Sequence, residues 1–192
     1  MNYRLSLNDS KMLKPHDVLC VLKISCLHGQ EWTLRDLGKM VGLSGSEAYN
    51  SSKRLKASGL IYEASGEVKI VGRKLVDFIV YGIPAVYYPE RGQITRGMAT
   101  GASASPLSER LQAFDGDIPL VWPTAGGKVR GETLVPIYKT APAAAAADGK
   151  LYELLVLVDA LRTGRARERK LATEILEERL VGRAQPAERA VS

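Results

Sequence analysis

The feature that most constrains the fold is a pair of short helical segments between residues 33 and 58, each with its own start signal. Thr33 and Ser44 are residue types favoured at helix N-caps, because their side-chain oxygens accept from the unpaired N–H groups of the first turn. Asp36 and Glu47 follow them by three positions, which is the spacing of a capping box. A glycine after the apolar positions of each segment suits the end of a helix. The sequence therefore predicts two short helices joined by a tight turn.

The segments on either side of this pair extend the pattern. Residues 15–28 predict an earlier helix, because Pro15 suits a first helical position and an apolar stripe follows it. Residues 60–70 predict a short hairpin that turns at Ser65 and Gly66. Three helices followed directly by a hairpin are typical of a winged helix-turn-helix, so we expect that fold at the N-terminal end.

The middle of the chain, residues 83–140, contains an internal repeat. The pattern aromatic-Pro-x-x-Gly-x-x-x-Arg-Gly begins at Tyr88 and again at Trp122, 34 positions later. Its arginines are Arg96 and Arg130. Each copy predicts a strand, a tight turn and a returning strand. The repeat therefore predicts a small β-rich module built from two related hairpins.

Helices are predicted in the remaining segments. An apolar helix should occupy residues 72–81 and end at Gly82 and Pro84. Near the C-terminus, an apolar segment and an amphipathic segment are separated by Gly164 and predict a helical hairpin. The C-terminal helical ranges are 142–147, 151–161 and 165–181, and a short helix is expected at 107–113.

These patterns together predict an α+β chain of three parts and a tail. The predicted parts are a winged helix-turn-helix domain at 1–82, the β-rich module at 83–140, the C-terminal helical hairpin at 141–182 and a disordered tail at 183–192.

Charge and composition narrow the class of protein. The formal net charge is +6, which favours polyanionic partners because neutralised phosphates release counterions. No apolar stretch reaches the length of a membrane span, and the N-terminal residues show no apolar core of a secretion signal. Cys20 and Cys26 are expected to be buried, reduced thiols on one helix. We therefore expect a cytoplasmic protein with no membrane segment.

The second helix of the pair carries residues that suit contact with a DNA major groove. Its N-terminal end has Ser46, Tyr49 and Asn50, and an asparagine amide forms a bidentate pair with adenine. Lys53 and Arg54 lie further along, where phosphate contacts are expected. The full set of predicted DNA-binding residues is Thr33, Ser44, Gly45, Ser46, Tyr49, Asn50, Lys53, Arg54 and Lys69.

Two assignments stay open at the level of sequence. Glu47 either caps its own helix or accepts from a cytosine amino group, and its spacing from Ser44 favours the cap. Arg96 and Arg130 either bind a ligand or partner, because paired arginines can fork a carboxylate or phosphate, or brace their own hairpins.

The sequence predicts no enzyme. The two histidines, His16 and His28, have no neighbouring cluster with metal-ligand spacing. No nucleophile elbow, phosphate-binding glycine loop or dinucleotide fingerprint is present. We therefore expect no catalytic residues, no cofactor and no metal.

The segment 37–61 resembles the winged-helix regulators of the MarR-like kind. Three further features resemble a bacterial family of helix-turn-helix regulators: Leu-Ser-x-Ser-Glu at 43–47, the run ending in Thr-Arg-Gly at 95–97, and the Trp-Pro and Val-Arg-Gly motifs that lead to the apolar segment 151–162. Such regulators are encoded beside nucleotidyltransferase-like proteins. The resemblance implies an antitoxin and autorepressor paired with a nucleotidyltransferase-like toxin. The Tyr, Asn, Ser and Ser at 49–52 depart from the family and leave the operator sequence open.

The sequence thus predicts a repressor that binds double-stranded DNA as a homodimer, with helix 44–58 in the major groove. The alternative is a protein-binding antitoxin or adaptor that holds a partner enzyme with the β-module and the C-terminal helices.

Overall fold

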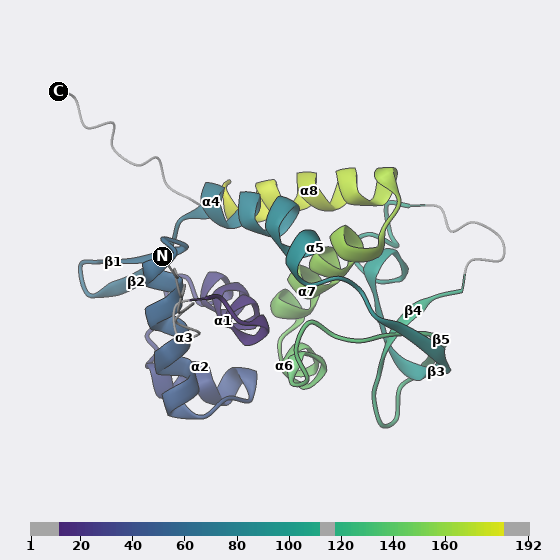
Figure 1. The fold of residues 1–192 in the computed structure, drawn as a ribbon, viewed down its shortest axis with the longest axis horizontal. Helices are drawn as coiled ribbons and strands as arrows, with labels where there is room; N and C mark the ends of the chain where they lie inside the picture. Colours follow the sequence, from purple (N-terminus) through teal and green to yellow (C-terminus); the bar gives the residue numbers. More distant parts are fainter. Residues whose placement is uncertain (1–11, 112–117, 183–192) are drawn as a thin grey trace, which may run out of the picture.

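A computed structural model describes residues 12–111 and 118–182 of the chain, which is of the α+β class (Figure 1). Helices α1 to α3 and the hairpin β1–β2 lie at one end of the molecule, and strands β3 to β5 lie at the other. The C-terminal helices α7 and α8 run between the two ends. The predicted tail at 183–192 lies outside the described residues.

The first three helices begin where the sequence signals placed them. They are α1 (Pro15–Cys26), α2 (Leu34–Val41) and α3 (Gly45–Ala57). At α2, the Asp36 N–H donates to the Thr33 hydroxyl at 3.2 Å and the Thr33 N–H donates to the Asp36 carboxylate at 3.1 Å. Ser44 and Glu47 make the same reciprocal pair at the start of α3. Both predicted capping boxes are therefore confirmed.

The predicted hairpin is formed by β1 (Ile61–Ala64) and β2 (Glu67–Ile70), which pair antiparallel with Ile61 opposite Ile70. Ser65 and Gly66 have φ values of 54° and 79°. Two positive φ values in a two-residue loop match the strand twist of a hairpin, so the turn residues fix this register.

The prediction that Gly82 and Pro84 end the next helix is wrong. The helix α4 (Gly72–Asp77) continues through a π-helical turn, η1 (Phe78–Gly82), into α5 (Ile83–Val86). Ile79 and Ile83 are both fully buried, so the packing of this face favours a continuous helix. The widened π turn interrupts the regular hydrogen-bond ladder immediately before the proline, where the missing N–H costs least.

The β-module does not consist of two hairpins, and that prediction is also wrong. The first repeat runs into one long strand, β3 (Arg91–Thr100), which holds its part from Gly92 to Gly97. The second repeat spans β4 (Leu120–Pro123) and β5 (Val129–Leu134). Both β4 and β5 pair antiparallel with β3, and they also pair with each other in parallel, which closes a three-stranded barrel.

The glycines of the repeat explain this closure. A Cβ atom on Gly97 would overlap the Trp122 carbonyl oxygen, and one on Gly131 would overlap the Pro119 carbonyl oxygen. Each Arg-Gly motif therefore marks a point where a neighbouring strand passes too close for any side chain. The barrel therefore closes through close strand approach at these glycines, and not through hairpin pairing within each copy of the repeat.

The helical segments after the barrel agree with prediction. They are α6 (Ala141–Ala147), α7 (Gly149–Thr163) and α8 (Ala166–Leu180), with Gly164 at the break between the last two. A short 3₁₀ turn, η2 (Gly101–Ser103), follows β3. Residues 107–111 form turns and no helix, and the rest of the predicted helix at 107–113 lies outside the described residues.

One buried cluster of apolar side chains extends from α1 through α8 and includes Trp122 of the barrel. A buried carboxylate, Asp159 of α7, accepts from the Trp122 indole at 2.7 Å and from the Thr100 hydroxyl at 2.8 Å. Arg162 donates to the same carboxylate at 2.7 Å and to the Tyr87 carbonyl at 2.9 Å. This network fixes the barrel and the end of α5 to α7, because an unsatisfied charge there would be costly.

Candidate nucleic-acid interface

One side of α3 faces away from the rest of the protein. Ser46, Tyr49, Asn50 and Lys53 are exposed and recur at helical spacing along this side. The opposite side buries Ala48, Ser51, Ser52, Arg54 and Leu55. The small buried residues allow α3 to pack closely against the rest of the protein. The polar residues of the exposed side remain accessible to a large partner.

Tyr49 and Lys53 lie one turn apart and interact with each other. The Lys53 ammonium lies 5.5 Å from the centroid of the Tyr49 ring, in a cation–π arrangement. Tyr49 is 53% exposed, although tyrosines are usually more buried. The pair places a positive charge and an aromatic surface side by side on the outward side of α3.

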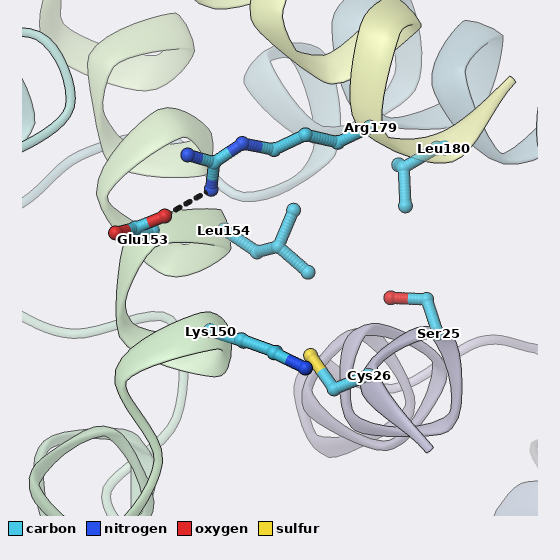
Figure 2. Close-up of a pocket in the computed structure, with 7 residues that line it drawn as sticks. All are labelled: Ser25, Cys26, Lys150, Glu153, Leu154, Arg179 and Leu180. Carbon is cyan, nitrogen blue, oxygen red and sulfur yellow. Dashed lines mark ion pairs between the residues drawn. The ribbon is translucent and has the colours of Figure 1, made fainter. Parts of the chain in front are cut away.

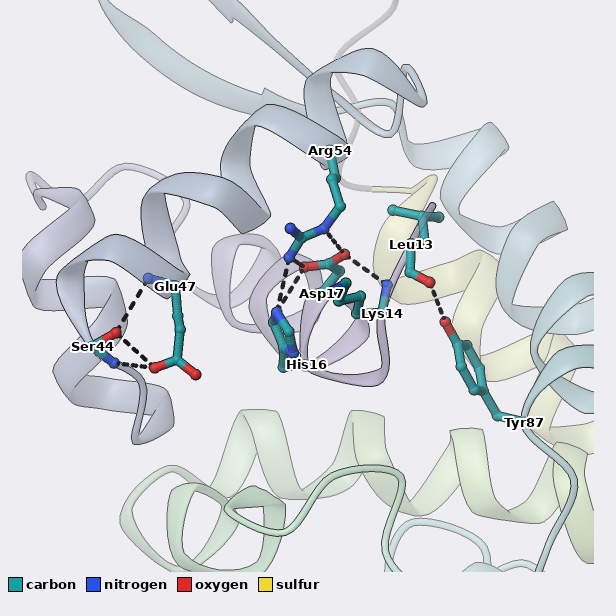
Figure 3. A network of polar contacts seen from close by, with 8 residues as sticks. All are labelled: Leu13, Lys14, His16, Asp17, Ser44, Glu47, Arg54 and Tyr87. Atoms are coloured by element: carbon teal, nitrogen blue, oxygen red, sulfur yellow. Dashed lines mark hydrogen bonds and ion pairs between the residues drawn. The ribbon is translucent and has the colours of Figure 1, made fainter. Parts of the chain in front are cut away.

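The assignment of Arg54 to a phosphate contact is wrong. Its side chain is buried, and its Nε and Nη2 atoms donate to the two carboxylate oxygens of Asp17 at 2.6 and 2.7 Å (Figure 3). Asp17 also accepts from the Lys14 N–H at 2.8 Å, which caps α1. Arg54 therefore joins α3 to the start of α1, and a phosphate cannot reach it. Arg54 and Lys53 are adjacent in the sequence but lie on different sides of one helix.

His16 completes this cluster. Its Nε2 atom lies 2.8 Å from Arg54 Nη2, and because a guanidinium only donates, the imidazole nitrogen must accept. Burial lowers the pKa of His16, the neighbouring Arg54 charge lowers it further, and Asp17 opposes the shift. The ring also packs edge-on against Tyr138, with centroids 5.4 Å apart. A neutral His16 therefore belongs to the support of α3.

The Glu47 side chain caps the N-terminus of its own helix. Its carboxylate accepts from the Ser44 N–H at 2.8 Å and from the Ser44 hydroxyl at 2.7 Å (Figure 3). These two hydrogen bonds are the main reason why the pKa of Glu47 is lowered. Of the two interpretations of Glu47, the structure supports the helix cap. Thr33 likewise makes its hydrogen bond within its own helix cap, where its hydroxyl donates to the Asp36 carboxylate at 2.6 Å.

A segment between β5 and α6 approaches the turn between α2 and α3. The Thr140 hydroxyl donates to the Val41 carbonyl at 2.6 Å, and a Cβ atom on Gly42, which has a φ of +70°, would lie 3.0 Å from the Thr140 side chain. Lys139 is exposed and is one of the charges that act on Glu47. The sequence alone does not indicate this position of Lys139, because no local pattern links it to a helix almost one hundred positions earlier.

The hairpin β1–β2 offers little positive charge. Lys69 lies 3.6 Å from the Glu67 carboxylate on the same strand. Lys56 of α3 lies 2.9 Å from Glu63 of β1. Both cations are exposed, so each ion pair is weak, and the hairpin itself carries two glutamates, Glu63 and Glu67, against the single lysine Lys69. The candidate interface is therefore centred on α3.

Arg96 and Arg130 lie in the barrel, at the opposite end of the molecule from α3 (Figure 1). They are directly opposite each other on β3 and β5, and both are exposed. The structure thus brings together the two arginines that sequence analysis selected, and separates them from the other selected residues.

A small cavity of about 130 Å³ lies between α1, α7 and α8 (Figure 2). Arg179 and Glu153 form an ion pair across it, and Lys150 extends beside Cys26. Burial raises the pKa of the Cys26 thiol to about 11, so this sulfur is protonated near neutral pH and is not an activated nucleophile. Both cysteines are free and buried, as predicted.

Within residues 12–111 and 118–182, no three His, Cys, Asp or Glu side chains are grouped so that they could bind a metal ion. No described helix has the length and apolar character needed to cross a bilayer. Comparisons with protein families, with curated proteins and with solved structures found no match to this chain.

Proposed function

We propose that this chain is a sequence-specific DNA-binding transcriptional regulator that inserts α3 into the major groove. The observation that carries the proposal is the outward side of α3, where Ser46, Tyr49, Asn50 and Lys53 are exposed on a helix held firmly from behind. Hydroxyl and amide groups near the N-terminus of a helix suit base edges, and an ammonium group further along suits a phosphate.

The order of the elements supports a winged helix-turn-helix. α2 and α3 are joined by a tight turn at Gly42, and the hairpin β1–β2 follows α3 directly. In that arrangement α3 is the recognition helix, α2 lies across the DNA backbone and the hairpin is the wing. Because this wing carries paired charges, α3 supplies most of the contacts.

A cytoplasmic homodimer would present two copies of α3 to half-sites about one helical turn of DNA apart. Repression of its own promoter, as an antitoxin paired with a nucleotidyltransferase-like toxin, is the regulatory role that we propose. A second function, binding of a partner protein through the barrel, is favoured by the adjacent arginines Arg96 and Arg130 and is developed below.

Fluorescence anisotropy with DNA from upstream of the chain's own coding sequence tests the proposal. Asn50→Ala should weaken binding to the specific site by about 1–3 kcal/mol and reduce discrimination against unrelated DNA. Lys53→Ala should weaken binding to both DNAs and reduce the slope of log K against log[salt] by about 1.

Lys170→Ala is the matched control. Lys170 is an exposed lysine on α8 that lies 4.0 Å from Glu174, so its loss removes the same charge far from α3. If Lys53→Ala and Lys170→Ala change DNA affinity equally, or if the upstream DNA binds no better than unrelated DNA, the proposed role of α3 is wrong.

A further inference from the structure

The barrel places two like charges where strand pairing normally avoids them. Arg96 and Arg130 form a register pair between the antiparallel strands β3 and β5, so their side chains leave the same face of the sheet. Like charges directly opposite each other destabilise a strand pair. The fold therefore keeps an unfavourable contact that either strand could avoid with a neutral residue.

Within the part of the chain that the structure describes, no ion pair relieves this repulsion. Among the described residues, the side chains of Arg96 and Arg130 make no hydrogen bond and no ion pair. Glu132 lies on this face of β5, but its carboxylate accepts from Arg91 at 2.9 Å. Lys128, two positions before Arg130, is also exposed and adds a third positive charge.

An exposed aliphatic side chain lies beside the arginines. Ile94 is two positions before Arg96 on the same strand and is 44% exposed. Its register partner is Glu132, so it lies next to Arg130 on the same face. Arginine beside exposed apolar surface is typical of protein interfaces. A phosphodiester backbone would leave this isoleucine without an apolar contact.

This face of the barrel is also distant from α3, where we propose that DNA binds. The barrel and α3 occupy opposite ends of the molecule (Figure 1), so the face is available while α3 is engaged. We propose that Arg96 and Arg130 form a docking site for an acidic segment of a partner protein. The two guanidinium groups hold side-chain carboxylates in forked hydrogen bonds, and Ile94 packs against an apolar side chain of the same segment.

Fluorescence anisotropy with a labelled peptide of alternating Glu and Leu tests this site, and the same peptide with Gln in place of Glu is the charge control. The Glu peptide should bind the full chain, and the Gln peptide should bind at least tenfold more weakly. The double variant R96Q/R130Q should lose at least tenfold in affinity for the Glu peptide. The matched control R167Q/R169Q removes two exposed arginines from α8 and should bind as the original chain does.

A charge inversion separates binding from folding. R96E creates an opposite-charge pair with Arg130, so it should raise the thermal midpoint of unfolding while it abolishes peptide binding. R96Q should also raise the midpoint, because it removes the repulsion between the arginines.

Three results would overturn the proposal. The first is an equal loss of peptide affinity in R96Q/R130Q and R167Q/R169Q, and the second is a lower thermal midpoint of unfolding in R96E. The third is that the arginine pair binds a single-stranded or duplex oligonucleotide more tightly than it binds the Glu peptide. The last result would assign the site to nucleic acid. Because these variants leave α3 unchanged, binding of upstream DNA serves as a separate readout. Failure at the barrel with intact DNA binding would leave the function proposed for α3 in place.

Discussion

Loss of the Arg54 guanidinium should destabilise the protein strongly, although Arg54 lies on a helix proposed to bind DNA. Arg54→Ala removes two charge-assisted hydrogen bonds to Asp17, at 2.6 and 2.7 Å, and leaves a carboxylate whose side chain is 1% exposed. A hydrogen bond to a charged group contributes about 1.5–3 kcal/mol, and breaking a buried ion pair costs about 3–5 kcal/mol. We therefore expect the free energy of unfolding to fall by about 3–5 kcal/mol.

Urea unfolding followed by circular dichroism measures this loss. The double variant D17A/R54A should cost less than the sum of D17A and R54A, because the second substitution removes the charge that the first left unpaired. Lys56→Ala, on the same helix as Arg54, breaks an exposed ion pair with Glu63 of β1 and should cost less than about 1 kcal/mol. A loss below about 1 kcal/mol for Arg54→Ala, or strict additivity in the cycle, would refute the reasoning.

Three further predictions concern His16, Gly97 and Ser44. Burial lowers the pKa of His16 from its ordinary value of 6.5, so the unfolded chain binds the proton more readily than the folded chain does. The free energy of unfolding should therefore fall as the pH is lowered below 6.5 towards the folded-state pKa. Chemical unfolding at several pH values should show this slope, and H16Q should flatten it. Gly97→Ala places a Cβ against the Trp122 carbonyl oxygen and should cost about 1–3 kcal/mol by thermal unfolding, whereas Gly149→Ala, which meets nothing within 4 Å, should be neutral or stabilising; equal effects would contradict the close strand approach. Ser44→Ala removes the cap of α3 and should cost about 1 kcal/mol in urea unfolding, and a cost near zero would show that Glu47 caps the helix without the hydroxyl.

The elements fixed by local chemistry were predictable. Capping boxes at Thr33 and Ser44 and the turn at Ser65-Gly66 depend on residues that are neighbours in the chain. Their interactions form within one or two turns of backbone, so a spacing of three positions specifies them. The exposed residues of α3 follow from the same helical period.

The predictions from sequence are wrong where contacts between distant segments decide the structure. Arg54 has the helical position of a partly accessible cation, but Asp17, which lies on another helix, draws it into the interior. Gly82 and Pro84 are ordinary helix-ending residues, yet the buried Ile79 and Ile83 keep that helix continuous. The preference against glycine and proline inside a helix amounts to only about 1–3 kcal/mol, which tertiary packing can outweigh.

The sequence by itself determined the local elements: where helices begin, where the first hairpin turns, and that Arg96 and Arg130 occupy equivalent positions in a repeat. Only the tertiary structure decided that these two arginines stand directly opposite each other, because strand register depends on how a distant strand crosses Gly97 and Gly131. It likewise decided that Lys53 remains exposed while Arg54 is buried, since a partner carboxylate on α1 is available to only one of them. Short-range hydrogen bonds are specified by neighbouring residues, whereas burial and charge pairing depend on surfaces that exist only after the chain has folded.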